Sequence, residues 1–241
     1  MNSRRIISIA KEVLKVESEA IFQLIDKLDS NFETSIRKIL SCKGRIIIMG
    51  MGKSGIIAKK IASTMSSIGT PSYFVHPSDA FHGDLGMITN KDIAIIISNS
   101  GETSELIQLM NPLKRKKIPL IGLIGKHGST LAEHCTIYLD TSIEKEACSL
   151  DLAPTASTTA TLAMGDAMAV ALLETRGFDE KDFAELHPGG SLGKKLLLKV
   201  REIAHHDLDV PFIKSSTTIK EAILIISEKG FGVTGVLNEE E

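Results

Sequence analysis

The sequence is poor in the residues that mark several common protein classes. It has no tryptophan, and aromatic residues make up only 4% of its 241 residues, which argues against a nucleic-acid surface built on base stacking. Its 28 basic and 30 acidic residues leave a net charge of −2, so no overall field attracts nucleic acid or an anionic membrane. We therefore expect no nucleic-acid partner and no membrane partner, and any binding site must be local.

Cysteine is scarce, and the N-terminus lacks a long apolar run. Cys42, Cys135 and Cys148 are odd in number and form no C-x-x-C pair, which predicts reduced thiols and no structural zinc. Charged residues interrupt the N-terminal stretch every few positions, so it resembles neither a signal peptide nor a membrane span. These features predict a cytoplasmic protein.

The hydrophobic pattern changes its period along the chain. Residues 3–28 carry apolar residues at helical spacing, and a second helical pattern ends near Ile39. Short apolar runs then alternate with helical patterns, and we expect strands at 45–49, 72–75, 93–97, 120–124 and 136–139. Because these runs are apolar without alternation, they predict a mostly parallel sheet that helices cover on both faces. The fold class is therefore α/β, a doubly wound sandwich with a five-stranded sheet flanked by helices.

The first expected strand runs into a glycine-rich loop, GMGKSG, at residues 50–55. Its glycines match the dinucleotide fingerprint G-x-G-x-x-G, and its Gly-Lys-Ser resembles the tail of a P-loop. A dinucleotide site needs an acidic residue near the end of the second strand, where this sequence has His76. A P-loop needs a glycine where this sequence has Ile47. Both nucleotide motifs fail, and the structural alternative is a turn that lets strand and helix pack closely.

A second polar loop follows the third expected strand. It holds Ser98, Asn99, Ser100, Gly101 and Thr103. This is more hydroxyl groups than a helix cap needs, and neutral donors at the carboxyl ends of parallel strands suit an anion. The loop therefore predicts a site for a single phosphomonoester rather than a nucleotide.

Several segments together resemble a known family. They are GMGKSG, ISNSGET at 97–103, GTPSYFVHPSDAFHGDLGM at 69–87, KEAC at 145–148, APTASTTATLAMGDAMAVALL at 153–173 and FAELHPGGSLGKKLLLKV at 183–200. Over about residues 10–205 the sequence resembles the arabinose-5-phosphate isomerases, sugar isomerase (SIS) domain proteins that supply the lipopolysaccharide sugar Kdo. The resemblance implies an aldose-ketose isomerase that interconverts D-ribulose 5-phosphate and D-arabinose 5-phosphate through an enediol, without a cofactor.

The resemblance also implies roles for individual residues. The implied catalytic residues are Lys53, Glu105, Glu146 and His187. The implied substrate contacts are Gly52, Ser54, Gly69, Thr70, His76, His82, Ser98, Asn99, Ser100, Gly101, Thr103, Ser157 and Thr158. Glu146 or Glu105 would be the base, for which we expect a desolvated carboxylate with a raised pKa. His187 would act as an acid or base, and Lys53 would contact the phosphate or an oxyanion.

Each of these residues has a structural alternative. Lys53 is in a loop where a solvated lysine is common, and His187 precedes Pro-Gly-Gly and fits a turn. Glu146 lies among mixed charges that are typical of an exposed segment. His76 lies close in sequence to other His and Asp residues, but their spacing matches no standard zinc motif. We expect no required metal, and the resemblance implies His76 as a contact for an inhibitory zinc ion.

The sequence departs from the family pattern beside Glu146. After KEAC the relatives commonly continue with Pro, one residue and Gly, whereas this chain has Ser149-Leu150-Asp151. A stiff turn becomes flexible and gains a charge. We expect this change to alter the pKa or the placement of Glu146.

The resemblance implies two parts and an oligomer. Residues 1–202 would form the SIS domain, and residues 203–241 would form a truncated first CBS (cystathionine-β-synthase) repeat that includes a Thr218-x-x-Glu221 capping box. The assembly would be a homotetramer with its active sites at subunit interfaces. Two alternatives stay open: a phosphosugar-sensing module without catalysis, and an isomerase of another sugar phosphate.

Overall fold

The computed structural model describes residues 3–197, 199–205 and 209–238. Its contacts divide the chain into a first unit that ends at His187 and a second unit that begins at Pro188. The boundary between residues 202 and 203, which concerns the family's modules, stays a prediction.

The first unit is built on a five-stranded sheet. Its strands are β1 (Ile46–Gly50), β2 (Ser72–Phe74), β3 (Ile93–Ser98), β4 (Leu120–Ile124) and β5 (Ile137–Asp140). All neighbouring strands are parallel, in the order β2-β1-β3-β4-β5. The register pairs Ile48 with Phe74 on one side and with Ile95 on the other. Because the strand order reverses between β1 and β3, the crevice beyond their carboxyl ends is the expected ligand position.

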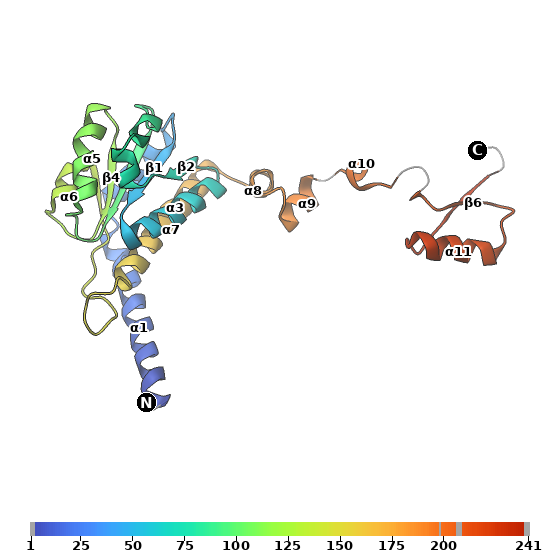
Figure 1. Ribbon diagram of the computed structural model, residues 1–241, viewed down its shortest axis with the longest axis horizontal. Helices are drawn as coiled ribbons and strands as arrows, with labels where there is room; N and C mark the ends of the chain where they lie inside the picture. Colours follow the sequence, from blue (N-terminus) through green and yellow to red (C-terminus); the bar gives the residue numbers. More distant parts are fainter. Residues whose placement is uncertain (1–2, 198, 206–208, 239–241) are drawn as a thin grey trace. The chain divides into compact units, whose positions relative to one another are not determined.

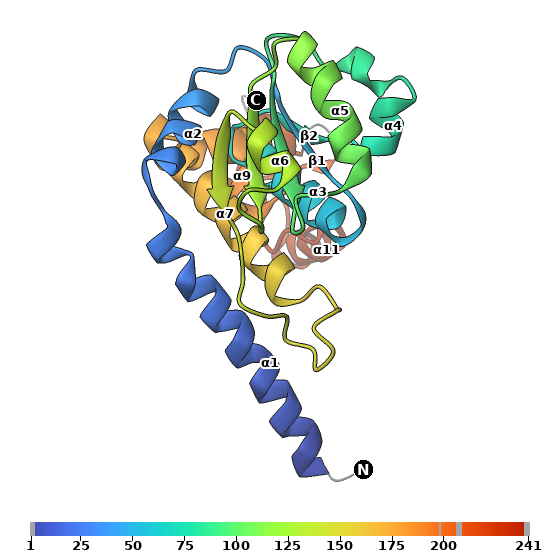
Figure 2. The same cartoon turned by 90° about the vertical axis from the view of Figure 1, so that its left-hand side faces the viewer.

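Helices cover both faces of this sheet. They are α1 (Ser3–Gln23), the 3-10 helix η1 (Ile25–Lys27), α2 (Ser30–Leu40), α3 (Gly52–Ser67), α4 (Pro77–Phe81), the 3-10 helix η2 (Asp84–Met87), α5 (Ser104–Arg115), α6 (Thr130–His134), α7 (Ala156–Arg176) and α8 (Glu180–Leu186). Helices α1, α2, α3 and α7 pack on one face, and α4, α5 and α6 pack on the other (Figure 1 and Figure 2). The predicted doubly wound sandwich is confirmed.

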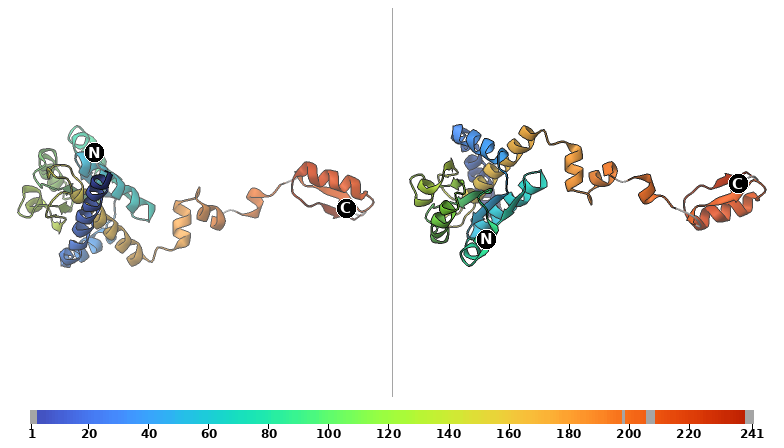
Figure 3. Two further views of the ribbon diagram at one scale, coloured as in Figure 1. Left: turned by 90° about the horizontal axis from the view of Figure 1, so that it is seen from below. Right: turned by 90° about the horizontal axis from the view of Figure 1, so that it is seen from above.

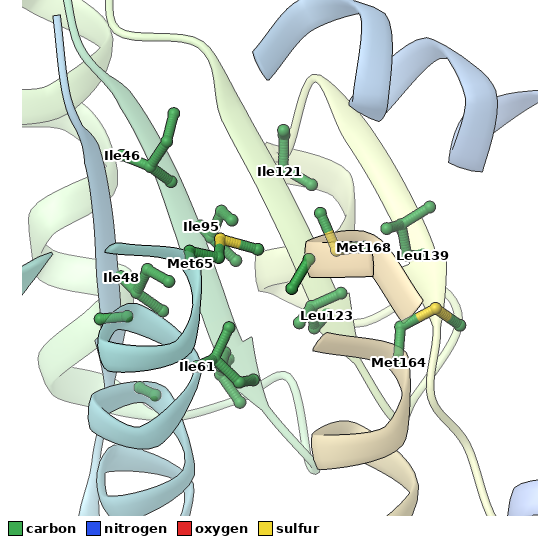
Figure 4. Packing of buried hydrophobic residues seen from close by; sticks show 14 of the residues in the cluster. Ile46, Ile48, Ile61, Met65, Ile95, Ile121, Leu123, Leu139, Met164 and Met168 are labelled. Carbon is green, nitrogen blue, oxygen red and sulfur yellow. The ribbon is translucent and has the colours of Figure 1, made fainter. Parts of the chain in front are cut away.

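The core explains why the strands show no alternation in sequence. On one face Ile46 and Ile48 of β1 pack with Met65 of α3 and with residues of α7 (Figure 4). On the other face Ile47 and Met49 pack against α5. All four strand residues are at most 2% exposed. Burying a side chain of this size stabilises a fold by roughly 2 kcal/mol relative to exposure, so both faces hold the sheet.

Helix α7 has the length and composition of a membrane span, alone among the helices of the described residues. Half of its apolar window is buried inside the fold. Met164, Met168 and Leu172 lie in the core against the sheet. Packing against the strands thus accounts for the apolar residues in the buried half of the helix.

The element positions follow the sequence closely. Each strand lies within one residue of its predicted range at either end. The helical pattern over residues 3–28 differs, because α1 ends at Gln23 and a 3-10 turn follows. The N-terminal part of α1 extends away from the sandwich (Figure 2), and its Ile6, Ile9 and Leu14 are at least half exposed.

The second unit contains a strand-helix-strand segment. The segment consists of β6 (Phe212–Lys214), α11 (Ile219–Lys229) and β7 (Gly235–Leu237). Two short helices, α9 (Ser191–Leu197) and α10 (Val200–Ile203), precede it in the unit. Strands β6 and β7 are parallel, and α11 lies beside them in both views of Figure 3. The predicted capping box is confirmed, because Glu221 Oε2 accepts from the Thr218 amide at 3.1 Å and Thr218 Oγ1 accepts from the Glu221 amide at 3.4 Å. The identity of this unit as part of a CBS repeat stays a prediction.

Candidate active site

A cavity of about 550 Å³ opens at the carboxyl ends of β1, β3 and β4. Its size is within the range of about 300–1,000 Å³ that small-molecule sites occupy. Five segments form its walls: the start of α3, the loop after β3, the residues after β4, the segment 143–154 and the start of α7. The cavity therefore lies at the reversal of strand order, where this fold is expected to bind ligands.

The N-terminus of α3 faces the cavity without a side-chain cap. Met51, Lys53 and Ser54 line the wall, and Met51, at the cap position, makes no capping hydrogen bond. The first backbone N–H that bonds within this helix belongs to Gly55 and donates to the Met51 carbonyl at 3.1 Å. The amides ahead of it carry the positive end of the helix dipole, which favours an anion. This arrangement suits a phosphate group.

The loop after β3 turns only part of its polar groups toward the cavity. Asn99 and Ser100 line the wall. The Ser98 hydroxyl lies 2.9 Å from that of Thr103 and accepts from the Gly101 amide at 3.0 Å. Ser98 is 3% exposed. Ser98 and Thr103 therefore shape the loop, and direct contact of their hydroxyls with a substrate stays a prediction.

Glu146 lies at the N-terminus of α7, on another wall of the same cavity. One of its oxygens accepts from the Thr155 amide at 2.8 Å and from the Ser157 amide at 3.2 Å. The Ser157 hydroxyl donates to the other oxygen, and the Thr155 hydroxyl donates to the first oxygen at 3.0 Å. Four donors thus fix the carboxylate over the helix start. Ser157 and Thr158 also line the cavity.

Because of these contacts, the pKa of Glu146 differs from the one expected for the base. Burial alone would raise the pKa of Glu146, but the hydrogen bonds from Ser157 and Thr155 outweigh burial, and the pKa is lowered from the usual 4.5. The pKa of Glu105 is lowered too, by hydrogen bonds from its own backbone N–H and from the Ser104 hydroxyl. The expected raised pKa is therefore wrong for both residues, because donors surround each carboxylate. Both are ionised at neutral pH and able to accept a proton.

Two other predicted residues, His76 and His82, lie at the two ends of α4 and do not line the cavity. His76 follows β2 at the cap position of α4, and it is close enough to Glu105 for its charge to lower the pKa of that carboxyl. His82, at the end of α4, is exposed and its ring meets Phe81 edge-on at 5.9 Å. Like these two residues, Glu105 does not line the cavity.

Three predicted residues lie elsewhere. Gly69 and Thr70 precede β2, at the amino ends of the strands, where Arg176 donates to the Gly69 carbonyl and to the Thr70 hydroxyl. His187 follows α8, stacks on the Phe183 ring with centroids 3.9 Å apart and bonds the Phe183 carbonyl through Nδ1 at 2.9 Å. None of them lines the cavity.

The cavity also contains charged residues that the sequence did not single out. They are Lys126, Glu144 and Lys145. Lys126 comes two residues after β4 ends at Ile124, so applying the strand-end rule to the fourth strand would have found it. Among the described residues neither Lys53 nor Lys126 forms an ion pair. Both ammonium groups are therefore available to an anionic ligand.

The described residues contain no group of three or more His, Cys, Asp or Glu side chains that could hold a metal ion. His76, the predicted contact for an inhibitory zinc ion, instead meets the Phe74 ring edge-on with centroids 6.2 Å apart. Its zinc contact stays a prediction.

Comparison with known proteins gives consistent matches. The SIS domain family model matches residues 39–171. The chain is 49% identical over 229 residues to "Arabinose 5-phosphate isomerase KdsD" of Shigella flexneri, which covers 95% of this chain and 70% of that protein. It is 46% identical to the protein of the same name from Pseudomonas aeruginosa, over 97% of this chain and 72% of the relative. A solved structure of an Escherichia coli CFT073 protein in complex with arabinose 5-phosphate superposes with a TM-score of 0.76 at 42% identity, covering 78% of this chain and all of the other.

Proposed function

The chain belongs to the arabinose 5-phosphate isomerase family of SIS-domain proteins, and from this premise we propose that it interconverts D-arabinose 5-phosphate and D-ribulose 5-phosphate. One observation carries the proposal for this chain. A single cavity contains an uncapped helix start with Lys53 and an ionised carboxylate, that of Glu146. The first suits a phosphate group, and the second suits proton transfer next to a carbonyl.

We assign the roles from this geometry. The phosphate binds at the start of α3, with Lys53, Asn99 and Ser100 as contacts, which leaves the sugar carbons directed toward α7. Glu146 removes the proton from C1 of the ketose while the C2 oxygen takes up a proton, which gives the enediol. The same carboxyl then returns its proton to C2 as the C1 hydroxyl loses its own, which gives the aldose. Glu105 remains the alternative base.

The assay is incubation of the purified protein with D-arabinose 5-phosphate, without nicotinamide, nucleotide or added metal. Ketose should accumulate to an equilibrium ratio that is the same from either direction. Ribose 5-phosphate and glucosamine 6-phosphate are the matched controls and should react far more slowly. Saturable binding without ketose would point to a sensing module, and faster turnover of a control sugar would reassign the substrate.

We further propose that a neighbouring copy completes each active site in a homotetramer. Two features support this. His187 lies outside the cavity wall of its own chain, and α1 exposes Ile6, Ile9 and Leu14, an apolar face that a second copy would cover. Light scattering should give the mass of four chains. Mixing Glu146→Gln with His187→Ala chains should restore part of the activity that each lacks, and no restoration would place both residues in one chain's site.

We also infer that the protein is cytoplasmic. We infer further that its second unit is part of a CBS repeat. The three cysteines, Cys42, Cys135 and Cys148, are free thiols, which supports the first. The parallel β6-α11-β7 segment supports the second. Cell fractionation tests the location, and recovery in the membrane pellet would contradict it.

A further inference from the structure

The segment that carries Glu146 is held at two points. The Glu146 carboxylate is bound to the start of α7 through Thr155 and Ser157. The Glu146 backbone N–H donates to Asp151 Oδ1 at 2.6 Å, five residues further along the chain. The Asp151 side chain thus binds the main chain of Glu146, and the side chain of Glu146 in turn caps α7.

Asp151 has a backbone conformation that side chains rarely adopt. Its φ is +53°, and among the described residues only Lys117 shares a positive φ without being glycine. Asp tolerates this left-handed region better than most residues because its short side chain bonds locally. Here the local bond is the one to the Glu146 amide. Backbone strain of this kind is concentrated at functional sites, where the surrounding structure maintains it.

The hydrogen bond from the Glu146 amide to Asp151 closes a turn at the cavity wall. The Asp151 amide donates to the Cys148 carbonyl at 3.0 Å, and the Ala147 amide donates to the Thr155 hydroxyl at 2.9 Å. Glu146 and Asp151 both line the cavity. Without the carboxylate of Asp151, the Glu146 amide has no acceptor. The turn that positions Glu146 then lacks the hydrogen bond that joins its two ends.

We propose that Asp151 is a positioning residue for the isomerase reaction, which holds the main chain of Glu146 so that its carboxylate stays aligned with the bound sugar. This inference rests on the proposed role of Glu146. It predicts an effect on turnover rather than on substrate binding, because Lys53, Asn99 and Ser100 bind the phosphate from other segments. A misplacement of about 1 Å at a reacting group lowers rates by up to about a hundredfold.

The test compares three substitutions. Asp151→Gly permits the left-handed backbone but removes the acceptor, and it should lower kcat about tenfold or more with KM nearly unchanged. Asp151→Ala removes the acceptor and keeps a Cβ, and it should lower kcat at least as much. Asp151→Asn keeps an oxygen acceptor at the same position and should restore most of kcat. Equal loss in Asn and Gly variants, or wild-type kcat in the Gly and Ala variants, would overturn the inference.

A structural readout accompanies the kinetics. Hydrogen-deuterium exchange at the Glu146 amide should be faster in Asp151→Gly than in the wild type, and close to the wild type in Asp151→Asn. Exchange in β3 should be unchanged in all variants, which shows that the fold is intact. Unchanged exchange at Glu146 in the Gly variant would overturn the inference.

Combination with Glu146→Gln separates this inference from the proposed function. If Glu146 is the base, adding Asp151→Gly to Glu146→Gln should lower kcat no further, because the aligned group is already gone. A further tenfold loss in the double variant would overturn the positioning role while leaving Glu146 as the base. Full turnover of Glu146→Gln alone would overturn the proposed role of Glu146, and the Asp151 inference with it.

Discussion

Two helices, α3 and α7, begin at the walls of one cavity, and their N-termini differ in whether a side chain caps them. The start of α3 carries no side-chain cap, whereas the start of α7 is filled by the Glu146 carboxylate. At both ends the first amides have no partner within the helix and lie at the positive end of the helix dipole, which attracts anions. One fold therefore makes two anion sites with separate uses. One is left for a ligand, and the other fixes a carboxylate that the chain supplies.

The sharpest test of the filled site is Glu146→Gln. The amide keeps the shape of the side chain but cannot act as a base, so kcat should fall by about 10²–10⁴-fold. The cap should weaken only moderately, since exchanging a capping group typically costs about 1 kcal/mol. Steady-state kinetics and thermal unfolding measure the two effects separately.

Glu144→Gln is the matched control, because Glu144 also lines the cavity but accepts a hydrogen bond from Gln23 at 2.9 Å instead of capping a helix. Its kcat should stay near the wild-type value. A loss as large as that of Glu146→Gln would mean that the cavity needs negative charge in general rather than a base at α7.

The open site is tested by Lys53→Met. The substitution removes the ammonium group and keeps an unbranched side chain at the start of α3. A hydrogen bond to a charged group contributes about 1.5–3 kcal/mol, so kcat/KM should fall by about 10-fold to 100-fold, mostly through KM. Inhibition by inorganic phosphate should weaken in parallel.

Lys43→Met serves as the control, since Lys43 is exposed and precedes β1 at the opposite end of the sheet. It should leave KM and phosphate inhibition unchanged. If Lys53→Met lowers kcat alone and leaves phosphate inhibition intact, Lys53 contacts the reacting oxygens rather than the phosphate.

The filled site also makes stability depend on pH. The folded pKa of Glu146 is lowered from the usual 4.5, so its capping contacts stabilise the fold above pH 4.5, and this stabilisation is lost as the pH falls through the lower folded value. The unfolding midpoint of the wild type should therefore drop more between about pH 7 and about pH 3 than that of Glu146→Gln. Parallel curves for the two proteins would show that the carboxylate does not cap α7 in solution.

The sequence was sufficient for the sheet because the strands are buried on both faces. Continuous Ile-rich runs such as 93–97 need no partner information to be recognised as covered strands. The end of α1 was missed because residues 24–28 continue the apolar pattern, while the backbone tightens into a 3-10 turn there. Periodicity reports which side chains are buried, not which backbone hydrogen bonds they accompany.

The site was harder to predict than the fold, because its geometry depends on contacts between distant segments. The glycine loop and the loop after β3 were found from the strand-end rule, and both line the cavity. The cap formed by Glu146 joins residues 9 and 11 positions apart, so no local pattern reveals it or the resulting fall in pKa. Asp151 was recognised as a departure from the family, but its bond to the Glu146 amide required the folded turn.

The smallest effect is expected at the backbone of the open site. Gly52 begins α3 with φ +54°, and a Cβ added there would meet no atom within 4 Å. Gly52→Ala therefore introduces strain without a clash, and a left-handed alanine costs about 1–2 kcal/mol. The unfolding midpoint should drop by a few degrees, about 2–4 °C per kcal/mol for a chain of this size. The unfolding midpoint of Gly52→Asn should drop less, because asparagine tolerates this conformation.

KM should rise only slightly in both variants, since the amides at the start of α3 keep their positions. If KM instead rises as much as in Lys53→Met, the amides at the start of α3 contribute as much to phosphate binding as the ammonium group does.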